Sequence, residues 1–187
     1  MAVSSPDNIA LGTPAPAFDL PDVNPLTNRG NISLADLTDA KAVVVIFTCN
    51  HCPYARHIEP ALIRMAKSYQ GRGVEFITIC SNDAETYPDD SPEEMARHAQ
   101  NVGFPFPYLH DATQEVARAY GAVCTPDIYV YDADHKLTYR GRFDETRPKG
   151  DDAHGSELAA AVDAVLEGRP AIDVQHPAMG CSIKWKP

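Results

Sequence analysis

The chain has 187 residues, enough for one domain with a sizeable hydrophobic core. Its 26 acidic and 16 basic residues give a formal net charge of −10, which argues against nucleic-acid partners and anionic membrane surfaces. We find no apolar run of membrane-spanning length and no secretory signal, so we expect a cytoplasmic protein. Thiols are mostly reduced in that compartment, and the odd number of five cysteines does not predict a static framework of disulfides.

The first half of the chain predicts short strands followed by a strand–helix–strand unit. A Pro/Ser/Gly-rich segment over residues 1–14 leads into short strands around a polar loop over residues 15–37. Residues 42–47 read Ala-Val-Val-Val-Ile-Phe, which is typical of a fully buried strand. Apolar residues at helical spacing predict a helix from Cys52 to about Gln70, which we expect Pro60 to kink.

The second half predicts further strands and helices, and then a tail. The expected elements are a strand over 73–80, a helix over 91–102, an edge strand over 104–109, a short helix over 113–120, a hairpin over 127–141 and a helix over 156–166. This order favours an α/β fold, with a mixed central sheet flanked by helices. We therefore expect a domain over residues 1–169, with an N-terminal strand extension, and a Pro/Gly/His-containing tail over residues 170–187 on or near it.

Two cysteines follow the buried strand directly. Cys49 and Cys52 form a C-x-x-C motif where a helix should begin, and helix N-termini stabilise thiolates through unpaired N–H groups and the positive dipole end. The pattern predicts a dithiol/disulfide site, against the alternative of two buried cysteines that stay reduced. We expect Cys49 to attack, Cys52 to resolve the mixed disulfide, and His51 between them to stabilise the thiolate by its partial positive charge.

The strand–C-x-x-C–helix unit, followed by Thr125-Pro126 before a hairpin, resembles the thioredoxin fold. The resemblance implies a cis-proline that faces the dithiol and binds substrate through Thr125 and Pro126; the alternative is that Pro126 only starts an edge strand. The opening over residues 12–20 and the long insert after the second buried strand resemble the peroxiredoxin-like branch, which includes alkyl hydroperoxide reductase/thiol-specific antioxidant proteins. This resemblance implies a protein disulfide or hydroperoxide substrate and a cellular thiol reductant, with no cofactor.

Two departures from these families matter for the chemistry. Peroxiredoxins carry Thr three residues before the reactive cysteine, where this chain has Cys49 before Cys52. Thioredoxins carry a buried Asp six residues before the first cysteine, where this chain has Val43, so the proton acceptor is unassigned. Arg140 and Arg142 are candidates for the peroxiredoxin arginine, although we favour exposed strand positions for both. The departures favour disulfide exchange over peroxide reduction.

Three hypotheses follow from these residues. The first is a thiol–disulfide oxidoreductase, the second a thiol peroxidase, and the third a Cu(I)- or partner-binding redoxin module. Cys181 is a candidate third thiol that returns to the dithiol from a mobile tail, or else a tail cysteine packed by Trp185. One C-x-x-C pair and scattered histidines do not predict a closed metal site. Residues 104–108 are a candidate homodimer contact, unless they pack on the chain's own core.

Overall fold

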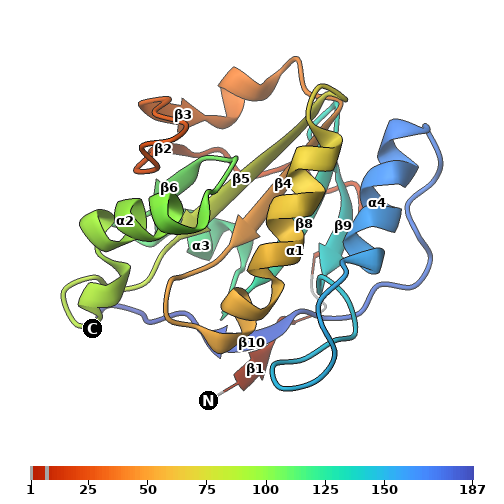
Figure 1. Ribbon diagram of the computed structural model, residues 1–187. Coiled ribbons are helices and arrows are strands. Elements are labelled where there is room, and N and C mark those ends of the chain that lie inside the picture. Colours follow the sequence, from red (N-terminus) through yellow and green to blue (C-terminus); the bar gives the residue numbers. More distant parts are fainter. Residues whose placement is uncertain (1, 7–8) are drawn as a thin grey trace.

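The computed structural model describes residues 2–6 and 9–187, and a five-stranded mixed sheet lies at its centre (Figure 1). The strands run in the order β6-β5-β4-β8-β9, with β4 parallel to β5 and antiparallel to β8. Their bounds are β4 (Ala42–Phe47), β5 (Val74–Cys80), β6 (Tyr108–His110), β8 (Asp127–Asp132) and β9 (Leu137–Gly141). This sheet confirms the predicted fold class.

Strand β4 is buried along its whole length because helices cover both faces of the sheet. Its side chains alternate: Val44 and Ile46 pack in the cluster formed with α1, α2 and α4, whereas Val43, Val45 and Phe47 pack with α3 and η1. Figure 1 shows α1 and α4 on one side of the sheet and α3 on the other. The helices are η1 (Leu34–Leu37), α1 (Pro53–Tyr69), η2 (Pro88–Asp90), α2 (Pro92–Val102), α3 (Glu115–Tyr120) and α4 (Ser156–Leu166).

Helix α1 begins later than the C-x-x-C motif alone predicts. Its first residue is Pro53 and its N-cap is Cys52, while Cys49 lies in the preceding loop. The reason is that proline favours the first helical position, where its missing N–H costs nothing. The sequence therefore correctly predicts a helix after the motif, but the expectation that Cys49 stands at the helix start is wrong.

Short strands complete the fold outside the central sheet. Strands β2 (Asp19–Pro21) and β3 (Asn31–Ser33) form a hairpin, and β1 (Ala2–Ser4), β10 (Met179–Ser182) and β7 (Cys124–Thr125) form an antiparallel three-stranded sheet in the order β1-β10-β7. Part of the expected tail, Met179–Ser182, is thus a paired strand, whereas the sequence suggested that Cys181 lies on a mobile segment. Within the expected segment 1–14, residues 1, 7 and 8 lie outside the described residues.

Two further expectations concern the surface. Phe104, Phe106 and Tyr108 are buried and belong to the core cluster under α1 and α2, so the aromatic side chains of this segment pack on its own domain. Among residues 2–6 and 9–187, no helix has the length and apolar character needed to cross a bilayer.

Candidate redox-active site

Cys52 is the centre of a cluster of three thiols. It is fully buried, and in its protonated form its Sγ donates a hydrogen bond to the Thr125 carbonyl oxygen at 3.1 Å. The thiols of Cys49 and Cys181 both hydrogen-bond to it, as does the N–H of Ala55 in the first turn of α1. The hydrogen bond from Cys49 is the main cause of a lowered Cys52 pKa, with smaller contributions from Thr125, Cys181 and Ala55, while burial opposes them.

Cys49 has the opposite electrostatic environment. Its hydrogen bond to Cys52, its burial and the negative charge of Asp90 raise the pKa of its thiol, in that order of size. Its Sγ also lies 3.4 Å from the Thr125 hydroxyl oxygen. Both shifts favour the thiolate on Cys52 over that on Cys49, in keeping with the place of Cys52 at the N-cap of α1.

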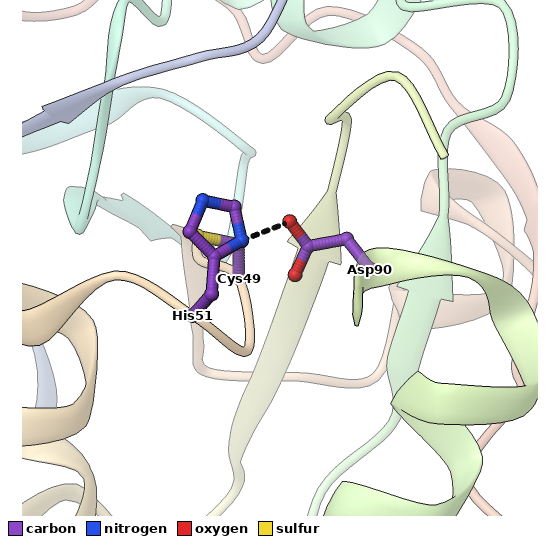
Figure 2. A group of neighbouring side chains, drawn as sticks. All are labelled: Cys49, His51 and Asp90. Carbon is purple, nitrogen blue, oxygen red and sulfur yellow. Dashed lines mark ion pairs between the residues drawn. The ribbon is translucent and has the colours of Figure 1, made fainter. Parts of the chain in front are cut away.

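His51 lies beside Cys49 and contacts a buried carboxylate (Figure 2). Its Nδ1 is 2.6 Å from Oδ2 of Asp90, an ion pair when the imidazole is protonated. Asp90 also accepts the backbone N–H of Asn50 and the side-chain amide of Asn82, each at 2.8 Å. Asp90 thus fixes both the loop between the two cysteines and the imidazole within it.

Strand β10 brings Cys181 to the dithiol. Cys181 stands opposite Thr125 in the antiparallel pairing of β10 with β7, and a Cβ on Gly180 would collide with the Thr125 carbonyl oxygen. Cys181 is only partly buried, whereas Cys49 and Cys52 are almost fully buried. Partial burial, followed by its contact with Cys52, raises the pKa of the Cys181 thiol to about 11. Close packing of the strand therefore holds this third thiol beside Cys52.

The Thr125–Pro126 peptide bond is cis, as the resemblance implies. Thr125 contacts Cys49 through its hydroxyl group and Cys52 through its carbonyl group, so the loop faces both thiols. However, β10 already pairs with β7 at this position. A substrate peptide that added here as a strand would have to displace β10, which limits the expected role of Thr125 and Pro126 in substrate binding.

The candidate arginines are engaged elsewhere. The side chain of Arg140 is 7% exposed and forms an ion pair with Asp127 at 3.1 Å, while Arg142 pairs with Glu157 at 2.7 Å. The expectation that both are exposed strand residues is wrong for each: the Arg140 guanidinium is buried against Asp127, and Arg142 is half-buried and lies just after the end of β9. Each guanidinium is paired with a carboxylate of its own, so neither arginine is placed as the peroxiredoxin arginine that stabilises the thiolate.

The remaining cysteines play no visible part in the dithiol. Cys80 and Cys124 are fully buried, and burial raises the pKa of each thiol. Strand-end packing accounts for both positions. All five cysteines are free thiols in this structure.

Within the part of the chain that the structure describes, two side-chain groups have donor atoms close enough together to hold a metal ion. In the first, ligand atoms of Cys49, His51 and Asp90 lie within 4.8 Å of one another; the second consists of Asp144, Glu145 and His154. In the first group both Asp90 oxygens already accept hydrogen bonds from Asn50 and Asn82. These hydrogen bonds favour a role for Asp90 in orienting the neighbouring residues over a role as a metal ligand.

Sequence reasoning missed Asp90, the residue that organises the loop between the cysteines. It lies 38 residues after Cys52 in η2, next to a second aspartate, and nothing in its local pattern distinguishes it. The position of Cys52 had a local signal, since Pro53 directly after it marks the first residue of a helix.

Comparisons with solved structures bear on the fold. A solved structure of an uncharacterized conserved protein from Geobacillus kaustophilus has a TM-score of 0.94 and 49% identity, covering 100% of this chain and 97% of that one. The thioredoxin domain of a thiol-disulfide oxidoreductase from Bacteroides vulgatus has a TM-score of 0.61 and 21% identity, covering 82% of this chain and 99% of that one. The second likeness establishes the thioredoxin fold.

Two sequence matches identify the family. A relative named "Putative peroxiredoxin" from Mycobacterium tuberculosis strain H37Rv is 32% identical over 118 residues, 63% of this chain and 68% of the relative. The model of the AhpC/TSA family matches residues 11–140, which include Cys49, Cys52, Thr125 and Pro126. This region is more than half of the sequence, and the chain therefore belongs to the AhpC/TSA family.

Proposed function

We propose that the chain is a thiol–disulfide oxidoreductase in which Cys52 is the attacking thiolate. The observation that carries this proposal is the place of Cys52 at the N-cap of α1, in contact with two other thiols. A thiolate is the reactive form of cysteine, and a lowered pKa keeps it available at neutral pH. An odd number of five cysteines does not suit a static framework of disulfides, so we propose that this exchange takes place in the cytoplasm.

The reaction begins when the Cys52 thiolate attacks one sulfur of a disulfide. The substrate S–S bond breaks, a mixed disulfide forms at Cys52, and one substrate thiolate leaves. Cys49 or Cys181 then loses its proton and attacks the Cys52 sulfur, which releases the second substrate thiol and leaves a protein disulfide. A cellular thiol reductant restores the reduced protein. Each turnover moves two electrons, and no cofactor enters the balance.

Peroxide reduction is the second candidate, and two observations favour it. The chain belongs to the AhpC/TSA family, and both Cys49 and Cys52 are almost fully buried beneath a paired strand. A small oxidant reaches such a sulfur more easily than a folded protein does. In this reaction the Cys52 thiolate would attack the hydroperoxide, whose O–O bond breaks to release an alcohol or water, and Cys52 would become a sulfenic acid. Either neighbouring thiol would then condense with the sulfenic acid to give a disulfide and a molecule of water.

Reduction of an aromatic disulfide, 5,5′-dithiobis(2-nitrobenzoic acid), tests the main proposal, because each released thiolate is coloured. Wild-type protein should release two thiolates per site: one when Cys52 attacks and one when a second thiol resolves. Cys52→Ser should abolish both rapid releases. Cys124→Ser is the control, because this buried cysteine lies outside the three-thiol cluster and both releases should persist. Rapid release from Cys52→Ser would contradict the assignment.

The same variants distinguish the two reactions. If the protein is a peroxidase, hydrogen peroxide in place of the disulfide should rapidly give a disulfide between Cys52 and a neighbouring thiol, detected by mass spectrometry, and Cys52→Ser should form none. If peroxide consumes the Cys52 thiol much faster than the aromatic disulfide does, the peroxidase is the better assignment.

A further inference from the structure

The proposed exchange leaves one proton without an acceptor. Cys49 must become a thiolate before it attacks the mixed disulfide at Cys52, yet burial and the nearby charge of Asp90 favour its protonated form. Thioredoxins place an aspartate where this chain has Val43, which has no acid–base chemistry. Another group near Cys49 is therefore needed to take the proton.

The imidazole of His51 is in position for this task. One of its ring nitrogens, the Cys49 sulfur and an Asp90 carboxylate oxygen lie within 4.8 Å of one another. Figure 2 shows the ring beside Cys49, with an ion-pair contact from Nδ1 to Asp90. On the other side of the loop the ring stacks on Tyr87, with centroids 6.0 Å apart and an angle of 12° between the ring planes. Its orientation is thus set from two directions.

Asp90 is itself held firmly. Its side chain is fully buried, and its two oxygens accept hydrogen bonds from the Asn50 N–H and the Asn82 amide. Asn50 is fixed in turn, since its side chain donates to the Asp89 carbonyl and accepts from the Tyr108 hydroxyl. A carboxylate fixed in this way can orient an imidazole and stabilise the positive charge that forms when the ring gains a proton.

We propose that His51, oriented by Asp90, is the general base that takes the proton of Cys49 in the resolving step. The Cys49–Cys52 bond then forms as the bond from Cys52 to the substrate sulfur breaks, and the imidazolium passes its proton to the departing thiolate or to solvent. His51 is the catalytic residue and Asp90 a positioning residue. This inference rests on the proposed disulfide exchange and concerns only its second step.

Other groups around Cys49 are poorly suited to this role. Burial raises the pKa of both Cys80 and Tyr108, so at neutral pH they hold protons of their own. The Cys52 sulfur is bonded to the substrate at this stage and cannot accept the proton. Among the described residues close to Cys49, the His51–Asp90 pair is the one that combines an imidazole nitrogen with a carboxylate in contact with it.

The two thiolates released from 5,5′-dithiobis(2-nitrobenzoic acid) separate the two steps. We would use Cys181→Ser as the parent protein, so that Cys49 is the resolving thiol, and follow absorbance by stopped flow with one equivalent of the reagent. Adding His51→Gln should leave the first release unchanged and slow the second by about 100-fold, the lower range for a lost general base. Asp90→Asn keeps an oxygen for the Asn50 N–H and should also slow only the second release.

His98 provides a matched control. Its Nε2 lies 2.6 Å from Glu59, the same separation as in the His51–Asp90 pair, but it belongs to α2 and lies outside the loop between the cysteines. His98→Gln should leave both releases unchanged. In His51→Ala, added imidazole should restore the second release; a second release that stays slow would mean that His51 acts only on structure, and would overturn the proposal.

The outcomes separate this inference from the proposed function. If the Cys181→Ser parent shows no first release that depends on Cys52, the disulfide exchange itself is wrong. If the first release occurs and His51→Gln resolves at the parental rate, only the role of His51 is wrong. Equal slowing of both steps by His51→Gln would also overturn the proposed role of His51. So would slowing of the second step in the parent protein by a metal chelator, which would indicate a bound metal at Cys49, His51 and Asp90.

Discussion

The two thiols beside Cys52 come from very different parts of the molecule. Cys49 lies three residues away in the loop between β4 and α1, almost fully buried and close to the negative charge of Asp90. Cys181 arrives on β10 near the C-terminus, partly exposed and close to the positive charge of Lys184. Both hydrogen-bond to Cys52, yet one is held by local chain geometry and the other by pairing between distant strands.

This difference suggests two resolving thiols with separate roles. A disulfide between Cys49 and Cys52 would be shielded from solvent, while one between Cys52 and Cys181 would lie nearer the surface, where a reductant reaches it more easily. The His51–Asp90 pair adjoins only the Cys49 side. The following experiments test whether the two sides differ in this way.

Removal of both neighbouring thiols should have the largest effect. In Cys49→Ser/Cys181→Ser, Cys52 can still attack a disulfide but no adjacent thiol can resolve the product, so the protein should stop as a stable mixed disulfide. Each single variant should retain resolution through the remaining thiol. Mass spectrometry of intact protein after one equivalent of 5,5′-dithiobis(2-nitrobenzoic acid) would show an adduct on Cys52 in the double variant and an internal disulfide in both single ones.

If one of the two single variants does not resolve the mixed disulfide, then only one of the two neighbouring thiols is a resolving thiol. If Cys49→Ser accumulates the adduct while Cys181→Ser does not, Cys181 is not a resolving thiol, and its contact with Cys52 serves only to stabilise the thiolate.

Gly180→Ala should affect the Cys181 side selectively. Its added Cβ would meet the Thr125 carbonyl oxygen, so β10 must shift and carry Cys181 away from Cys52. We expect a loss of about 1–3 kcal/mol in the free energy of unfolding, the usual range for overpacking, and loss of the Cys52–Cys181 disulfide in a Cys49→Ser background. Urea unfolding and disulfide mapping measure these effects.

The exposed neighbour Met179 supplies a control for the same strand. Met179→Ala removes apolar atoms from a side chain that is 38% exposed, so the unfolding free energy should hardly change. If Gly180→Ala and Met179→Ala have the same unfolding free energy, β10 can make room for the added Cβ without loss of stability. The close contact between Gly180 and the Thr125 carbonyl would then not be what holds Cys181 beside Cys52.

The sequence predicted those features of the site that depend on local pattern. The β-branched run before Cys49 and the helical spacing after Pro53 place a strand and a helix around the motif, because burial on both faces of a sheet and on one face of a helix leaves a clear periodicity. Thr125-Pro126 was recognised through resemblance to a fold, and the structure has the expected cis bond.

Features that depend on tertiary packing had no such signal. Asp90 reaches His51 because η2 folds back over the end of β5, and Cys181 reaches Cys52 because β10 takes a particular register against β7. A pattern within ten or fifteen residues cannot report either contact. Which cysteine stands at the helix start was also missed, since a shift of three residues in that start changes which sulfur meets the N–H groups.

The smallest expected effects concern the pKa of Cys52. The hydrogen bond from Cys49 lowers this pKa most, and that from Cys181 contributes less, so Cys49→Ala should raise it further than Cys181→Ala. The rate of Cys52 alkylation by iodoacetamide as a function of pH, located by mass spectrometry, measures the difference. Wild-type protein should remain reactive at pH values where a free thiol, with a pKa of about 8.5, is almost entirely protonated.

The sign of the linked stability follows from the same shift. Because the pKa of Cys52 is lower in the folded than in the unfolded protein, its thiolate adds stability that is fully present above the unfolded-state pKa and is lost as the pH falls through the folded value. Reduced wild-type protein should therefore lose more stability on acidification than Cys52→Ala does. If Cys181→Ala shifted the alkylation profile more than Cys49→Ala, the partly exposed thiol would be the main partner of Cys52, and the ranking of the two sides would be reversed.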